Sequence, residues 1–80
     1  MKGILEFDLN EPEEVIAHKR AVKALDLCLV LWDMDQHLRA QTKYAPDDMP
    51  EEVYDTLSKT REELYRIMNE HNVSLDELLR

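Results

Sequence analysis

The chain of 80 residues lacks the features that hold most small domains together. It has one cysteine, so it cannot close an intrachain disulfide, and it has no cluster of Cys and His for a structural metal. A domain of this length buries too small a fraction of its surface to be comfortably stable alone. Oligomerisation is the remaining common source of stability, so the sequence predicts a symmetric assembly, either a dimer or a tetramer.

The shortage of glycine and of nucleophiles argues against catalysis. With one glycine the chain has no glycine-rich loop to cradle a phosphate. Cys28 has no evident base beside it, Ser58 falls on a predicted helix, and Ser74 falls at a predicted helix start. Asp33 and His37 are four residues apart, but two ligands do not make a metal site. We therefore expect no enzyme, no metal and no cofactor.

Long apolar runs are also absent. The longest, Leu27–Trp32, is far too short to span a membrane, and Met1–Leu5 is followed at once by Glu6 and Asp8, unlike a signal peptide. A lone Cys28 is typical of a reducing compartment, so we expect a cytoplasmic protein with no membrane partner. The net charge of −8 argues against binding to duplex nucleic acid.

The residues that are present favour helices. Apolar residues make up 44% of the chain and charged residues 35%, as in a helix-rich globular protein. The pattern predicts one all-α domain, an antiparallel two-helix hairpin with a short C-terminal helix, assembled as a symmetric bundle. The expected parts are an arm over 1–9, a helix over 11–42, a turn over 43–48, a helix over 49–71 and a short helix over 74–80.

Helix boundaries are predicted from capping residues. Three residues that cap well are each followed, three positions later, by a glutamate that completes a capping box. These pairs are Asn10 with Glu13, Asp48 with Glu51, and Ser74 with Glu77. Asn72 suits the left-handed residue that ends a helix, with Val73 as the apolar residue after it.

Each long helix carries an apolar stripe at helical spacing. On the first helix the stripe is Val15, His18, Val22, Leu25, Leu29 and Trp32; on the second it is Val53, Leu57, Thr60, Leu64 and Ile67, widened by Met68. The first helix is about ten residues longer, so its N-terminal half lacks cover. We expect the oligomer interface there, at Val15, His18, Val22, Leu25 and Leu29.

A candidate ligand site follows on the same helix. Trp32, Asp35, Arg39 and Lys43 recur on one face, with Tyr44 next in sequence. Asp35 precedes Arg39 by four residues and is placed to hold its guanidinium for a contact with phosphate. Trp32 would then stack on a base. In the alternative interpretation Trp32 is a core residue, and Arg39 pairs with Asp35 and with Asp55 of the second helix.

The antiparallel hairpin makes further charge pairs possible. It puts Glu51 and Asp55 near Arg39 and Lys43. It also sets three basic residues of the second helix opposite three acids of the first: Lys59, Arg61 and Arg66 opposite Asp35, Asp33 and Asp26.

Four short motifs occur in order along the chain: Trp-Asp-x-Asp-Gln-x-Leu-Arg at 32–39, Lys43-Tyr44, Arg61-x-x-Leu64 and Val73-Ser74-Leu75-Asp76. With these motifs the chain resembles a group of small phage-encoded helical-hairpin proteins. The likeness covers nearly the whole chain, including an apolar-acidic arm like residues 5–9. His37 departs from the second aromatic residue that often sits there. The resemblance implies a phage origin and does not name an activity.

Two binding functions are compatible with this pattern, besides a third option, a purely structural accessory protein. By analogy with small oligomeric phage proteins that sequester cyclic nucleotides, the chain is expected to bind a cyclic oligonucleotide immune signal and so block a host defence. The ligand residues would be Trp32, Asp35, Arg39, Lys43 and Tyr44. The alternative is an oligomeric helical module that binds and inhibits a host protein through the exposed part of the first helix.

Overall fold

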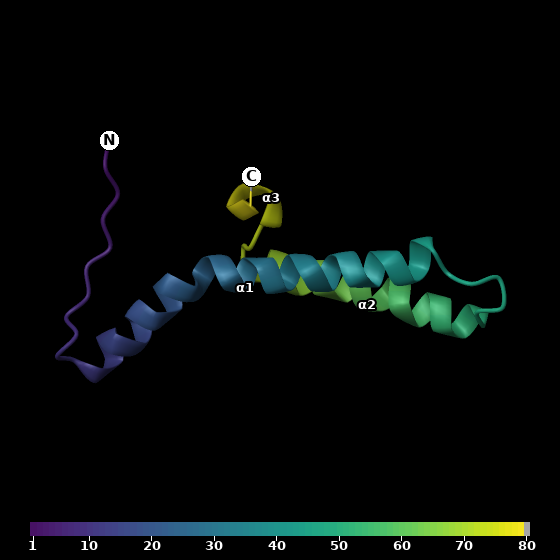
Figure 1. Cartoon of the computed structure of the whole chain (residues 1–80), viewed down its shortest axis with the longest axis horizontal. Coiled ribbons are helices and arrows are strands. Elements are labelled where there is room, and N and C mark those ends of the chain that lie inside the picture. Colours follow the sequence, from purple (N-terminus) through teal and green to yellow (C-terminus); the bar gives the residue numbers. More distant parts are fainter. Residues whose placement is uncertain (80) are drawn as a thin grey trace.

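A computed structural model describes residues 1–79 and contains helices with no strand among them. The helices are α1 (Pro12–Lys43), α2 (Glu51–Glu70) and α3 (Leu75–Leu79). α2 runs back along the C-terminal half of α1, so the predicted all-α antiparallel hairpin is confirmed (Figure 1). Both long helices are shifted slightly from the expected bounds, and Arg80, expected at the end of the short helix, lies outside the described residues.

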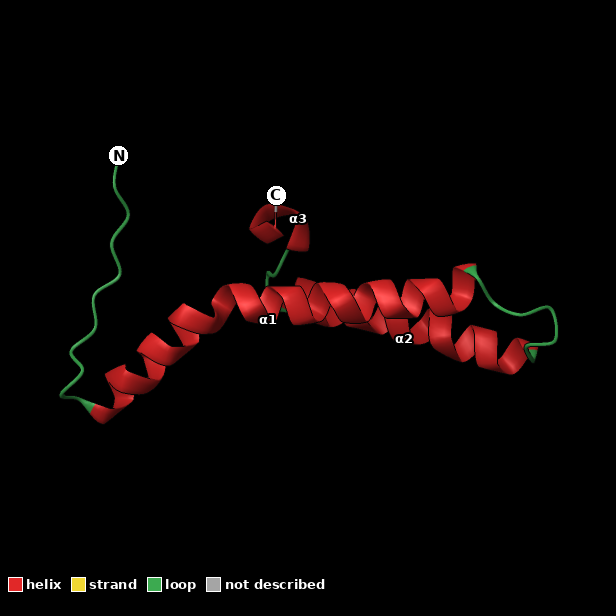
Figure 2. Cartoon of the chain, viewed as in Figure 1, coloured by secondary structure: helices red, strands yellow, loops and turns green. Residues whose placement is uncertain are grey.

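The hairpin is elongated. It measures 57 × 30 × 20 Å, and its radius of gyration is 17.7 Å. A globular domain of this length has a radius of gyration of about 12 Å. The N-terminal half of α1 extends beyond the end of α2, preceded by an extended arm (Figure 2). A single chain therefore encloses little interior.

The two long helices meet along a seam whose positions alternate by three and four residues, as in a coiled coil. α1 contributes Cys28, Leu31, Asp35, Leu38 and Thr42, and α2 contributes Tyr54, Leu57, Arg61, Leu64 and Met68. Leu38 and Met68 are buried there, and Asp35 pairs with Arg61 near the middle. The seam thus combines apolar layers with one polar layer.

The predicted apolar stripes were only partly right about which faces meet. On α2, Leu57, Leu64 and Met68 of the predicted stripe lie in the seam, whereas Val53 and Ile67 are exposed. In α1 the expected stripe faces away from α2, because a seam that includes Asp35 lies on the adjacent side of the helix. The sequence pattern favoured continuous apolar stripes, and the real seam has a charge pair in its centre.

α3 folds back onto the middle of α1. Leu75 is buried, and Leu78 and Leu79 line a cavity together with Trp32 of α1. Leu78 remains 53% exposed, so the leucines of this helix are not all covered. This contact covers one part of the stripe that was predicted to be an oligomer interface.

The reversal after α2 is a Schellman motif. Asn72 has φ of 56°, the left-handed conformation predicted for it. The Val73 amide donates to the Met68 carbonyl at 2.9 Å, and the Asn72 amide donates to the Asn69 carbonyl at 3.1 Å. These bonds satisfy carbonyls at the end of α2 and turn the chain toward α1.

Only one of the three predicted capping boxes supplies the expected cap. The Glu77 amide donates to Oγ of Ser74 at 3.3 Å, which caps α3. α1 instead begins after Glu11 and α2 after Pro50, and neither residue caps with its side chain. Pro12 and Pro50 move these starts because the residue before a proline is disfavoured in the helical conformation, which keeps Glu11 and Met49 outside the helices.

Residues 1–8 form an extended arm that is not a strand, and residues 8–11 form a turn in which the Glu11 amide donates to the Asp8 carbonyl. The arm's one aromatic residue, Phe7, packs edge-on against His18, with ring centroids 5.4 Å apart. At the arm's base, the Asp8 amide donates to Oε1 of Glu14 at 3.2 Å. The arm therefore covers His18, one of the residues predicted to lie at an oligomer interface.

Asn72 provides a direct test of the turn that places α3. Replacing Asn72 with Val forces a β-branched residue into the left-handed region and should lower the free energy of unfolding by about 1–2 kcal/mol. Asn72→Gly should be neutral or slightly stabilising, because glycine adopts that conformation freely. Urea unfolding at a fixed protein concentration measures both. Equal stability of the Val and Gly variants would contradict the assigned turn.

Candidate functional site

The most buried polar group is the carboxylate of Asp35, whose residue is 1% exposed. Nε of Arg61 donates a hydrogen bond to its Oδ1 at 2.7 Å, and Nη2 donates to Oδ2 at 3.4 Å. Nε2 of Gln36 donates to Oδ2 at 3.1 Å. The predicted Asp35–Arg39 pair is therefore wrong, because the carboxylate turns into the seam and binds a residue of α2. Arg61 was among the residues expected to lie opposite these acids.

Tyr65 completes the polar cluster around Asp35. Cζ of Arg61 lies 5.6 Å from the centre of the Tyr65 ring, within range of a cation–π contact. Burial raises the pKa of Asp35, but hydrogen bonding to Arg61 and Tyr65 and the charge of Arg61 outweigh it, so the pKa lies below its ordinary value of 3.8. Burial and the neighbouring carboxylate raise the pKa of Tyr65. Asp35 is thus held ionised inside the seam.

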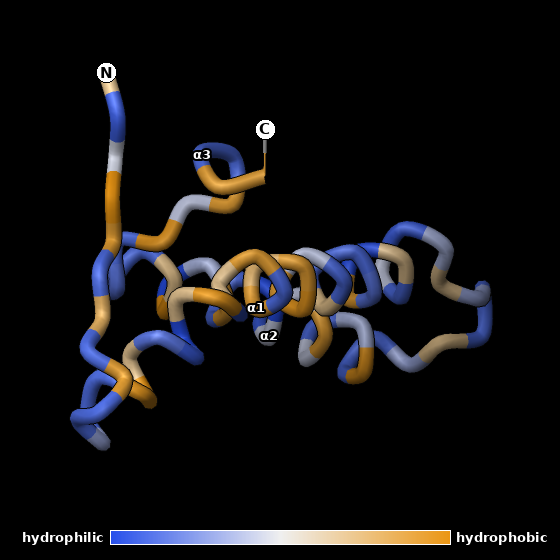
Figure 3. Tube along the Cα trace, turned by 60° about the vertical axis from the view of Figure 1, so that its left-hand side comes forward, coloured by the Kyte–Doolittle hydropathy of each residue, from blue (hydrophilic) through white to orange (hydrophobic). Residues whose placement is uncertain are grey.

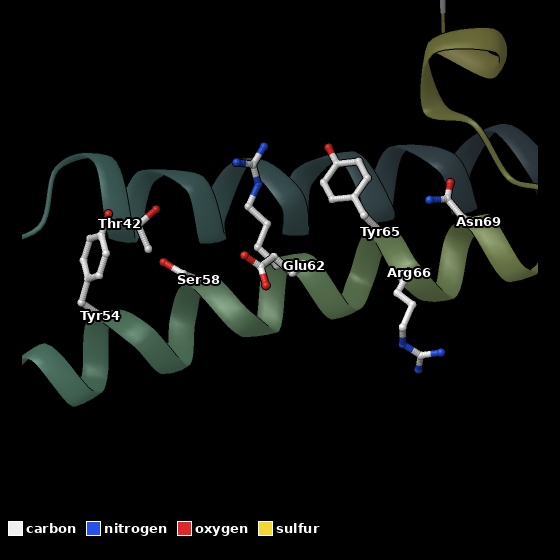
Figure 4. Close-up of a pocket in the computed structure, with 8 residues that line it drawn as sticks. Thr42, Tyr54, Ser58, Glu62, Tyr65, Arg66 and Asn69 are labelled. Carbon is white, nitrogen blue, oxygen red and sulfur yellow. The ribbon is translucent and has the colours of Figure 1, made fainter.

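A polar groove opens beside this cluster, with a volume of about 710 Å³. Figure 4 shows Tyr54 and Tyr65 rising from α2 toward α1, while Arg66 points away. The groove residues are Thr42, Tyr54, Ser58, Arg61, Glu62, Tyr65, Arg66 and Asn69. The sequence analysis missed it, although two tyrosines eleven residues apart on one helix were a usable signal.

The cations of the polar groove are already neutralised. Arg61 is paired with Asp35, and Arg66 is paired with Glu63 and Glu70 on α2. A phosphate entering the groove would meet guanidinium groups that have carboxylate partners. The groove is therefore poorly suited to an anionic ligand.

Three of the five predicted ligand residues do lie together. Arg39, Lys43 and Tyr44 line a small cavity of about 160 Å³ with Gln36 and Ala40. Nζ of Lys43 is 5.4 Å from the centre of the Tyr44 ring. Within residues 1–79 neither Arg39 nor Lys43 forms an ion pair, so the expected pairs with Glu51 and Asp55 are absent there. These two cations are open to an anion.

The other two predicted ligand residues lie elsewhere. Asp35 is inside the seam, and Trp32 borders cavities between α1 and the α3 region, beside Leu75 and Asp76. Eleven helical residues, or about 16 Å, separate Trp32 from Lys43 along α1. Trp32 is 43% exposed, so it is not the fully buried core residue of the alternative interpretation either. One chain does not bring the five residues into a single pocket.

An apolar groove of about 620 Å³ lies along the hairpin. Its walls are Leu31, Met34 and Leu38 of α1, and Leu64 and Ile67 of α2; its polar margin is Thr56, Lys59, Thr60 and Glu63. Lys59 and Glu63 are the charged residues among this lining, which is otherwise apolar apart from two threonines. An apolar side chain from another helix is the kind of group that such a groove accepts.

The described residues 1–79 hold no group of three His, Cys, Asp or Glu that could bind a metal ion. Among the helices of these same residues, none is long and apolar enough to cross a membrane. Comparisons with protein-family models, curated proteins and solved structures found no match to this chain. The resemblance to phage proteins therefore stays a prediction.

The ion pair in the seam makes a prediction about pH. The pKa of Asp35 is lower in the folded chain than the value near 3.8 expected when the chain is unfolded. The ionised carboxylate therefore stabilises the fold fully above that unfolded pKa, and this stabilisation is lost as the pH falls through the folded pKa. Asp35→Asn should lower the free energy of unfolding by about 1–2 kcal/mol at pH 7. The loss is smaller than for a fully buried ion pair, because Arg61 is partly exposed.

Chemical unfolding of both proteins at a series of pH values tests this. The stability difference between them should shrink as the pH is lowered below about 4, because the protonated carboxyl resembles the amide. Asp33→Asn, an exposed acid on the same helix, is the matched control and should change little. A difference that is the same at pH 7 and pH 3 would contradict the assigned role of Asp35.

Proposed function

We propose that this protein is a helical interaction module that works as a homo-oligomer. The observation that carries the proposal is the amount of surface that one chain leaves exposed. Its accessible surface is 7091 Å². A compact monomer of 9.5 kDa has about 5,000 Å².

The excess of about 2,000 Å² is of the size that a stable assembly hides. Interfaces of obligate homodimers bury roughly 1,000–2,500 Å² on each chain. The extended arm contributes part of the excess, and α1 contributes much of its apolar part. Leu38, Met68 and Leu75 are the buried apolar residues in the described part of the chain, which is a very small core for a domain of this length.

Exposed apolar side chains occur on several sides of α1. Val22 and Leu25 lie toward one side, and Leu27 and Val30 lie together on another. Figure 3 shows apolar residues all along the middle of this helix. A helix that is apolar all round is ordinarily buried within a larger structure. This supports a function based on helix-to-helix contact, first with copies of the same chain.

The first prediction concerns the assembly itself. Sedimentation equilibrium at micromolar concentration should give a mass at least twice that of one chain. A protein that remains monomeric, well folded and soluble up to about 100 μM would contradict the proposal, since exposed apolar patches of this size are rare in monomers.

Nucleotide sequestration is a second candidate, supported by the open cations Arg39 and Lys43 beside Tyr44. Their cavity is too small for a cyclic dinucleotide, since ligand pockets usually measure about 300–1,000 Å³. A second copy would have to supply the rest of the site, as an assembly with two-fold symmetry does when two such clusters face each other. In this candidate the guanidinium and ammonium groups bind phosphates and the tyrosine ring stacks on a base.

Thermal unfolding with a panel of cyclic di- and trinucleotides tests this candidate. A ligand present at 100 times its Kd should stabilise the protein by about 2.7 kcal/mol, a shift of several degrees. Arg39→Ala should remove the shift and keep the oligomer. Arg66→Ala, which removes a paired cation on α2, is the control and should keep the shift. No shift with any nucleotide would reject this candidate.

A further inference from the structure

α1 carries an apolar face that differs from the one predicted as the oligomer interface. Its members are Ile16, Leu27, Val30 and Met34, which are 50%, 57%, 59% and 49% exposed. At 100° per residue these four side chains fall within about 60° of one another. They lie on the opposite side of the helix from Val22 and Leu25. We call them the Ile16–Met34 face.

This face runs directly into the apolar groove. Met34 belongs to both, and the groove continues from it to Leu64 and Ile67 of α2. The predicted stripe, in contrast, is already partly covered. Phe7 packs on His18, and α3 lies beside Leu25, Leu29 and Trp32. Each member of the Ile16–Met34 face stays about half exposed or more, and Lys23 lies between Ile16 and Leu27 on the same face.

We propose that a second copy of the chain docks antiparallel along the Ile16–Met34 face, so that Ile16 of each copy enters the apolar groove of the other. This rests on the proposed function, because it names the surface through which the protein assembles. A two-fold axis near residue 25 of α1 sets Ile16 opposite Met34 and Lys23 opposite Leu27. The contact is isologous and closes on itself, which gives a dimer.

The groove and the incoming helix match in chemistry. Ile16 is a branched apolar side chain, and the walls around Met34 are leucine and isoleucine. The uncovered N-terminal half of α1 has no part of α2 beside it, so it is free to lie in the groove of a second copy (Figure 1). In the dimer both halves of each α1 are packed against a helix.

Charge favours the antiparallel direction. It brings Lys19 near Asp33 of the second copy, and Glu13 near Lys59 at the margin of the second copy's groove. A parallel pair would set Lys19 against Lys19 and Lys23 against Lys23, and like charges placed together oppose association. The aliphatic stem of Lys23 covers Leu27 while its ammonium stays in water.

Two matched variants separate this surface from the predicted one. Ile16→Glu and Val22→Glu each place one acid on α1, at side chains that are 50% and 63% exposed in the single chain. In the proposed dimer, Ile16→Glu puts a carboxylate between the apolar side chains of the second copy's groove and should raise the Kd of the dimer at least about a hundredfold. Val22→Glu should change this Kd by less than about threefold. Sedimentation equilibrium measures both, with circular dichroism as a check on helix content.

The outcomes distinguish failure of the proposed function from failure of this surface. A wild-type chain that is monomeric at every concentration overturns both. A wild-type chain that forms an oligomer which survives Ile16→Glu, or which the two variants weaken equally, overturns only the docking surface.

Cross-linking tests the direction without depending on a disruptive change. In a Cys28→Ala background, chains with Ile16→Cys and chains with Met34→Cys are refolded together and oxidised. The antiparallel dimer brings Cβ atoms of positions 16 and 34 within disulfide range, so the mixture should cross-link at least about fivefold more than either chain alone. Cross-links that form as readily within each single variant indicate a parallel pair and overturn the proposal.

Discussion

The constraint on which the rest of this structure depends is the shortage of apolar surface that one chain can bury. Folding must overcome a conformational entropy cost of about 1–2 kcal/mol per residue, and burial of apolar area is the main term that opposes it. Here the described chain buries Leu38, Met68 and Leu75 and leaves most of α1 in water. We infer that this arrangement, a long helix with apolar side chains on several sides and a shorter partner helix, is one part of a larger helical bundle.

Within the hairpin, the Asp35–Arg61 pair contributes more to register than to stability. Buried ion pairs give little net free energy, because desolvation offsets most of the attraction. A single polar layer between apolar layers nevertheless fixes which residues of α1 and α2 face each other, since any slip leaves Asp35 buried without a partner. The same pair explains why the candidate ligand site did not form as predicted: the acid expected to orient Arg39 is held by α2, and Arg39 is left in water.

Local signals in the sequence predicted the fold well. The apolar periodicity and the left-handed Asn72 were enough for the hairpin and for the reversal into α3. The packing faces could not be predicted in the same way, because apolar residues surround α1 and several stripes fit helical spacing. Asp35 was expected to pair with Arg39 on its own helix, since nothing local shows that its partner is 26 positions away. Tertiary pairing therefore decided which charges were free, and it left Arg39, Lys43 and Tyr44 together without Asp35.

The most direct test of the account is the dependence of thermal unfolding on protein concentration. If folding and assembly are coupled, the unfolding midpoint, Tm, followed by circular dichroism should rise by several degrees between about 1 and 100 μM. Helix content at the lowest concentration should also fall. A midpoint that stays constant over this hundredfold range, with full helix content throughout, would show that a single chain is stable alone and would contradict the central claim.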